Sequence, residues 1–395
     1  MEVRDAILPP GSLSSNARLL PGQPQRLALQ VITAFGFWLR TKLSKADAGV
    51  VQKLLMSALV PAVLFTSLCN VKIDADSLSY VAGGIGLVLL QITVAHTAAY
   101  TVFGFNASTM TRKSLELRRT AAMELGTCAP ALSVFAFVTE FVGPAFTAFA
   151  SLIDLPMKTY ILLVMPSILK ARAPRSDPSE AVPTDAPAAS GGWMKAALAQ
   201  LKDPFNAAII AGIALSLIFQ GNAMAKLGFV GVAFKSLAAA QTPVLFLLIG
   251  LKVSIEGATP SLCAVLLLRR QGLLMMAVKT FLLICSIKSI EIQILITLAS
   301  QAATSVIALG YFTNLRSQGY GYAPDFAFDI IGISFPFTII FNTAACLGGS
   351  AYIANMYPAG LALILLSGLL YKVSSNKIAD SLKDSRETEL QLPLR

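Results

Sequence analysis

Two apolar stretches of this chain are each interrupted by small and polar residues, and ligand chemistry is expected at these interruptions. In the first, Gly126 and Pro130 disturb a helical pattern, because proline removes a backbone donor and clashes with the preceding turn. The helix that resumes after such a break exposes N–H groups and partial positive charge, which favour anions. The second, residues 300–305, offers amide and hydroxyl groups. The expected substrate-binding residues are Gly126, Thr127, Cys128, Pro130, Gln301, Thr304 and Ser305.

Few ionisable residues fall within the apolar stretches. Glu124 precedes the first break and His96 is the single histidine, and both are candidates for proton coupling. A hydrogen-bonded core histidine is the alternative for His96, as an ordinary packed kink is for Pro130. Asp154 and Lys158 are four residues apart, so on a helix they share a face and can neutralise each other.

The two halves of the chain resemble each other. The segment around Pro61, Val60 to Phe65, is echoed by Thr242 to Phe246, and the first interruption is echoed by the second. Duplicated apolar segments broken by Pro, Gly or small polar residues are typical of secondary transporters. Chance similarity between apolar segments is the alternative explanation.

The composition indicates a multi-spanning membrane protein. Hydrophobic residues make up 55% of the chain and charged residues 13%, whereas soluble domains carry about 25% charge. The net charge of +10 arises from short basic clusters between apolar runs, where it orients helices rather than binding nucleic acid. The five cysteines form no CxxC pair and read as small buried hydrophobes.

A membrane helix needs about 20 mostly apolar residues. On this criterion, Arg269 and Arg270 are assigned to a loop, and the next helix is expected to begin after them. The first predicted span is short, and an interfacial helix is its alternative. Spans are predicted near 27–40, 50–70, 78–104, 120–138, 144–169, 204–220, 229–251, 271–287, 291–312 and 327–348, with a further apolar run at 351–371.

These spans divide the chain into two five-helix units. Five spans per unit is an odd number, so the second unit enters the membrane in the opposite sense and the repeat is inverted. The basic loops place the linker in the cytoplasm and the N-terminus outside. The predicted parts are an N-terminal tail (1–25), a first repeat (26–170), a cytoplasmic linker (171–198), a second repeat (199–349), an extra helix (350–372) and a C-terminal tail (373–395).

No enzyme constellation is present. A single histidine excludes a His-rich metal site, no Walker A motif supports an ATP-driven pump, and no cofactor is expected. The expected partners are a small organic anion and the lipid bilayer, and a homodimer is one assembly that the sequence allows. The plasma membrane and the endoplasmic reticulum are both compatible locations.

From residue 26 to 349 the chain resembles the auxin efflux carrier family. The resemblance is carried by an ordered set of segments rather than by one motif: Phe35-Gly36-Phe37 with Asp47 and Pro61, Asp203-Pro204, Leu248 to Leu251, Gln301-Ala302-Ala303 with Tyr311, and Tyr320-Gly321 with Asp325. The short linker stands where the family has its variable cytoplasmic loop.

The resemblance implies ten helices in two inverted five-helix repeats, with broken fourth and ninth helices crossing at the site of an exported organic anion. Thr304 stands where the family usually has a proline, and the region of Glu124 to Thr127 lacks the family's frequent asparagine. The run 351–371 is additional. The alternatives are a carrier of the sodium–bile acid symporter type and a non-transporting membrane receptor or scaffold.

Overall fold

The computed structural model describes a chain of helices. The described residues are 31–42 and 45–70 with short gaps, 77–104, 110–128, isolated positions between 129 and 143, and 144–172, 204–252 and 259–390. Within this described part of the chain, four helices are long and apolar enough to cross a membrane: Tyr80–Phe103, Thr259–Ile284, Pro324–Ala354 and Met356–Ser375. They support the predicted all-helical membrane protein, whereas ten spans in two inverted repeats remain a prediction.

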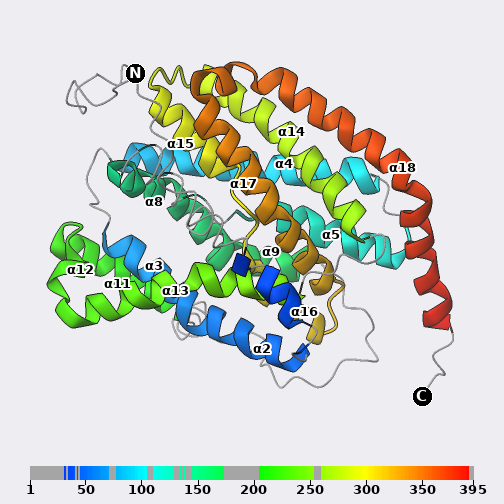
Figure 1. Ribbon diagram of the computed structural model, residues 1–395, viewed down its shortest axis with the longest axis horizontal. Helices are drawn as coiled ribbons and strands as arrows, with labels where there is room; N and C mark the ends of the chain where they lie inside the picture. Colours follow the sequence, from blue (N-terminus) through cyan, green and yellow to red (C-terminus); the bar gives the residue numbers. More distant parts are fainter. Residues whose placement is uncertain are drawn as a thin grey trace.

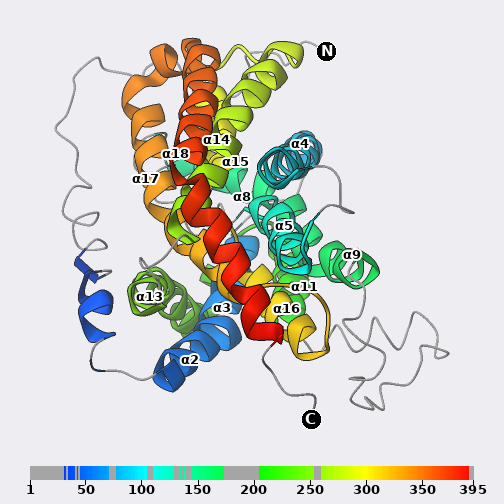
Figure 2. The ribbon, with the colours of Figure 1, turned by 90° about the vertical axis from the view of Figure 1, so that its right-hand side faces the viewer.

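The helices form two groups that lie side by side (Figures 1 and 2). In the first group, α3 packs against α11 and α13. Its members are α2 (Lys45–Leu54), α3 (Val60–Cys69), α11 (Pro204–Phe219), α12 (Ala223–Lys226) and α13 (Gly228–Lys252).

The second group is larger and contains the longest helices. Within it, α4 packs against α5, α8 and α14, and α14 packs against α17 and α18. Its members are α4 (Ser77–Phe103), α5 (Arg112–Leu125), α8 (Pro144–Thr159), α9 (Met165–Arg172), α14 (Thr259–Ile284), α15 (Ile290–Ser300), α16 (Val306–Ser317), α17 (Pro324–Ala354) and α18 (Met356–Leu390).

Two prolines are preceded by wider helical turns. A π-helical turn, Leu55–Leu59, leads into α3 just before Pro61, and a second, Tyr160–Val164, leads into α9 just before Pro166. A proline cannot donate to the carbonyl four residues earlier and its ring clashes with that carbonyl, so the wider turn accommodates it. Pro61 therefore follows a widened turn of its helix, whereas Pro243 lies inside a continuous α13.

Small residues bring α14 and α18 together along their length. A Cβ added at Gly272 would lie 2.5 Å from the Gly360 carbonyl oxygen, and one added at Gly360 would lie 2.7 Å from the Gly272 oxygen. Only glycine permits backbones to approach this closely, as is common between membrane helices. The extra apolar run at 351–371 is thus helical and packed. Its helix, α18, begins only at Met356, because α17 extends past a kink at Gly349 to Ala354.

The prediction of a loop at Arg269 and Arg270 is wrong, because both residues lie in the middle of α14. Both find partners there: the Arg269 Nε donates to Ser367 Oγ of α18, 3.1 Å away, and Arg270 binds the broken helices described below. The basic residues that follow Thr111 lie in α5, and the Thr111 hydroxyl caps this helix by accepting the Ser114 N–H.

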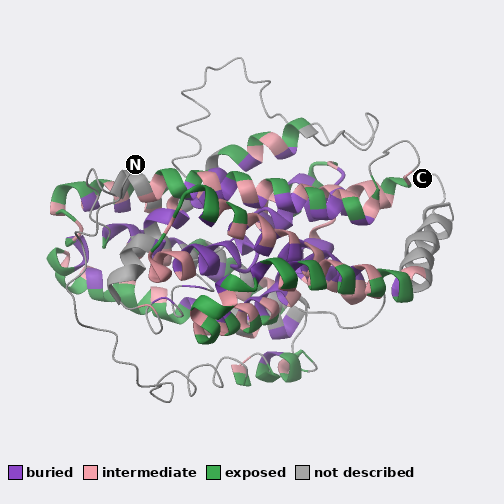
Figure 3. Cartoon of the chain, turned by 90° about the horizontal axis from the view of Figure 1, so that it is seen from above, coloured by how far each residue is buried: buried purple, intermediate pink, exposed green. Residues whose placement is uncertain are grey.

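The largest apolar core among the described residues lies mainly in the second group and reaches Leu55, Leu59 and Leu248 beside the first. Buried side chains of α4, α8 and α14 to α17 form most of it, and the buried positions fill the middle of the molecule (Figure 3). Large apolar side chains also face outward, among them Ile85, Leu89, Leu283 and Leu365. Outward-facing apolar residues on long helices are expected where lipid replaces water.

Candidate functional site

The first interruption ends α5. Gly126 is the C-cap of this helix, and a Cβ there would lie 3.5 Å from the Ile92 Cα and from the Ala95 Cβ of α4. Thr127 turns back onto the helix: its N–H and its hydroxyl both donate to the Glu124 carbonyl, at 3.0 and 2.7 Å. The chain therefore leaves α5 in a tight turn, with Cys128 extended beyond it. Pro130 lies outside the described residues.

The second interruption separates α15 from α16. Gln301 is the C-cap of α15, and Ser305 is the N-cap of α16, whose first turn it stabilises by accepting the Ile307 N–H at Oγ. The three residues between them belong to neither helix and are buried. The N-terminus of α16, with its partial positive charge, therefore begins inside the protein.

The two interruptions meet. Cys128 and Thr304 form an antiparallel bridge, and the Ser305 N–H donates to the Thr127 carbonyl at 3.0 Å. Residues far apart in the sequence thus pair their backbones at one point inside a helical protein. We call this point, residues 124–128 with 300–305, the crossing. It satisfies backbone groups that a broken helix leaves unpaired, as a bilayer requires.

Hydroxyl groups of α17 hold the second interruption from one side. Ser334 Oγ accepts the Thr304 N–H at 3.2 Å and lies 3.1 Å from the Thr304 hydroxyl. One turn further along, the Thr338 hydroxyl donates to the Gln301 carbonyl at 3.2 Å. From α4, the Gln91 amide donates to the carbonyls of residues 299 and 300 at 3.3 and 3.2 Å. These side chains replace the missing helical hydrogen bonds.

The Gln301 side chain is bound at the edge of the crossing. Its Nε2 lies 3.0 Å from the Tyr352 hydroxyl and its Oε1 lies 3.2 Å from the same oxygen. Tyr352 belongs to the last turns of α17, beyond the kink at Gly349. The amide that was expected to orient an anion is thus tied to a helix end that bends.

Arg270 reaches both interruptions from α14. Its Nε donates to the Leu125 carbonyl at 2.9 Å, and its Nη2 lies 2.8 Å from Cys128 Sγ and 3.5 Å from the Ala302 carbonyl oxygen. The residue is only 3% exposed. A guanidinium cannot lose its charge in a protein, so a fixed positive charge stands at the crossing.

Glu124 brings the opposite charge to the same place. The residue is completely buried in the last turn of α5, close enough to Arg270 for electrostatic attraction and next to the Thr304 hydroxyl. Among the described residues, neither carboxylate oxygen has a partner at hydrogen-bonding geometry. An ionised carboxylate is costly to bury, whereas its protonated form is not, so Glu124 is a candidate to exchange a proton at the crossing.

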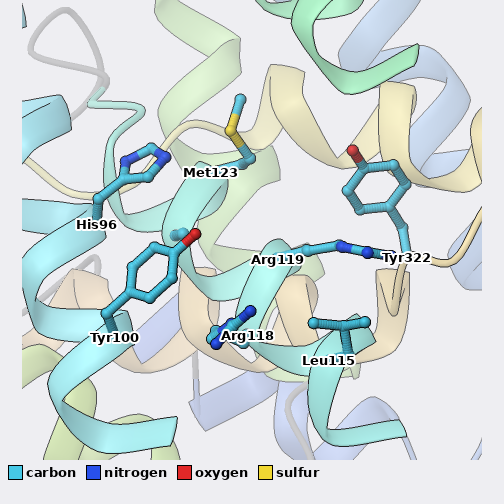
Figure 4. Close-up of a pocket in the computed structure, with 8 residues that line it drawn as sticks. His96, Tyr100, Leu115, Arg118, Arg119, Met123 and Tyr322 are labelled. Carbon is cyan, nitrogen blue, oxygen red and sulfur yellow. The ribbon is translucent and has the colours of Figure 1, made fainter. Parts of the chain in front are cut away.

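His96 lies in a cavity beside the crossing rather than in it. The cavity has a volume of about 340 Å³ and is lined from α4 by His96 and Tyr100 and from α5 by Arg118 and Arg119 (Figure 4). The Arg118 guanidinium stands 4.6 Å from the Tyr100 ring centroid, and His96 Nδ1 lies 2.9 Å from its own helix's carbonyl at residue 92. The face of α5 that lines the cavity leads to Gly126, one turn further on.

The structure thus brings most of the predicted site together. Thr127 and Cys128 meet Thr304 and Ser305 directly, with Gly126, Gln301 and Glu124 adjacent. The predicted neutralisation of Asp154 by Lys158 is confirmed, since Lys158 Nζ lies 2.8 Å from Asp154 Oδ2 in the interior. The sequence reading missed Arg270, Gln91, Ser334, Thr338 and Tyr352. The four-residue spacing of Ser334 and Thr338 in an apolar run was an available signal for two of them.

Compared with known proteins, the chain matches no protein-family model and no curated protein sequence. The family resemblance therefore rests on the residues quoted from the sequence, and the function must be argued from the crossing.

Proposed function

We propose that this protein is a secondary transporter that moves a small organic anion across a membrane by alternating access. The observation that supports this most is the crossing: two broken helices pair through the bond from the Ser305 N–H to the Thr127 carbonyl, beside a buried guanidinium. Broken helices at membrane depth are tolerated only where the protein or a water-filled cavity satisfies their backbone groups. Binding at such breaks, with one body moving against another, is the usual arrangement of secondary transporters.

The charges of the crossing favour an anion under one condition. Arg270 and the N-terminus of α16 are positive, whereas an ionised Glu124 would cancel the guanidinium and repel the anion. We therefore assign Glu124 a proton-coupling role, in which it is protonated while the anion is bound. His96 has a less direct role in this scheme, because it lines the neighbouring cavity.

The cavity beside the crossing provides an approach for the substrate. It is lined by the two arginines of α5 and by Tyr100 and Tyr322, with no acidic residue among its described lining. A cleft lined by one sign of charge concentrates ions of the other sign. A volume of about 340 Å³ is at the lower end of small-molecule sites and suits a small organic anion.

The test is flux through purified protein in liposomes. A panel of radiolabelled organic anions, including auxin-like carboxylates, is measured with wild type, Gln301→Ala and the matched control Gln318→Ala, whose glutamine is exposed at the end of α16. Flux of at least one anion that falls in Gln301→Ala and not in Gln318→Ala supports the proposal. No flux for any anion, with binding retained, would favour the receptor or scaffold alternative.

A further inference from the structure

Hydrogen-bond acceptors of both broken helices converge on one side chain. The carbonyls of Leu125 and Ala302 and the sulfur of Cys128 all face the Arg270 guanidinium, at 2.9, 3.5 and 2.8 Å. The two carbonyls belong to the interrupted segments, where the helical hydrogen-bond ladder ends. In secondary transporters, carbonyls of unwound helices are the groups that coordinate a coupling cation. At this crossing a side chain of the protein occupies that position.

The guanidinium is well suited to stand for a bound cation. It carries a permanent positive charge, presents several donors in a planar fork, and is less strongly hydrated than an ammonium ion. The Glu124 carboxyl is buried within electrostatic reach of this guanidinium. Arg270 extends from the middle of the continuous helix α14, so its charge cannot leave the crossing by dissociation.

We propose that Arg270 is a built-in cation in the position that a coupling Na⁺ would take at these carbonyls, so that anion transport needs no alkali cation. This inference rests on the proposed function for its transport consequence, but the cation position itself can be tested without transport. It separates this protein from carriers of the sodium symporter type, since a second cation at the same acceptors would stand beside a fixed positive charge.

The transport experiment compares flux of the anion identified above in sodium, potassium and choline salts at equal ionic strength. Wild-type flux is expected to be equal in the three salts and unaffected by an imposed sodium gradient. Flux that falls about tenfold or more in choline would overturn the inference. The comparison uses the wild-type chain, so it does not depend on the folding of a variant.

The binding experiment removes the side chain with Arg270→Ser. This variant exposes the carbonyl cluster, and millimolar guanidinium chloride is expected to raise its unfolding temperature relative to choline chloride, because a ligand that binds only the folded state stabilises it. Wild type and the control Arg269→Ser, whose arginine points to α18, are expected to show no rise. A folded Arg270→Ser without a guanidinium-specific rise would overturn the assignment.

Restored flux gives the last test. Arg270→Ser is expected to lose flux by about a hundredfold, since the buried acceptors of the crossing lose their donor, and to regain part of it with guanidinium. If the variant does not fold, Arg270→Lys takes its place: sodium-independent flux in it supports the inference, and a new sodium requirement contradicts it. A guanidinium-specific rise in Arg270→Ser without wild-type flux would retain the cation position and refute the transport proposal instead.

Discussion

The hydroxyls of α17 should determine the stability of the second interruption. Replacing Ser334 by Ala removes the acceptor of the Thr304 N–H, which lies 3.2 Å away in a buried segment. A buried donor left without a partner costs about 1–3 kcal/mol, more than the net value of an ordinary hydrogen bond. Thr338→Val removes the donor to the Gln301 carbonyl and is expected to cost less, about 0.5–1.5 kcal/mol, because a carbonyl oxygen has a second lone pair.

The measurement is the free energy of unfolding in mixed micelles, followed by circular dichroism during titration with a denaturing detergent. Ser236→Ala and Thr313→Val are the matched controls, because both hydroxyls are exposed and bond only to their own helix in α13 and α16. Exposed substitutions of this kind usually change stability by less than about 0.5 kcal/mol. A Ser334→Ala variant no less stable than Ser236→Ala would show that the interruption does not depend on α17, and the account of the crossing given above would fail.

Three further outcomes are expected. Glu124→Gln should leave anion flux insensitive to an imposed pH gradient that stimulates wild type, because the amide cannot exchange the proton; a variant with wild-type pH response would exclude Glu124 from coupling. Gly272→Ala should lower the free energy of unfolding by about 1–3 kcal/mol through the contact with α18, whereas Gly83→Ala, with open space around it, should not lower it; equal effects would refute the close approach. Asp154→Asn should cost about 3–5 kcal/mol by leaving Lys158 as an uncompensated buried charge, and thermal unfolding that matches wild type would contradict this.

The coarse features of the fold could be predicted because they depend on local composition. Long apolar segments indicate membrane helices, and Gly126 ends α5 as its residue type suggests. The second interruption carries no proline, so its resemblance to the first interruption was the main sign in the sequence that a helix breaks there. Its pairing with the first joins residues distant in sequence, and only the folded chain shows that Thr127 and Ser305 share a hydrogen bond.

Arg270 could not be predicted for a different reason. Averaged hydropathy treats an arginine as a residue that leaves the membrane, and this placed Arg269 and Arg270 in a loop. The penalty is offset by specific acceptors at the crossing and by the nearby Glu124, none of which belongs to the same helix. Whether a charged residue interrupts a span therefore depends on partners that a single segment does not contain.

The crossing has a consequence for how such a protein could diversify. Every described residue that holds it, from α4, α5 and α14 to α17, belongs to the second group of helices, and the first group packs beside it. A ligand bound at the crossing would move together with the second group of helices and would keep all its protein contacts during transport. Substrate recognition would then depend on residues of the second group, and movement on the surface between the two groups. Mutations of that surface could change the transport rate and leave the substrate unchanged.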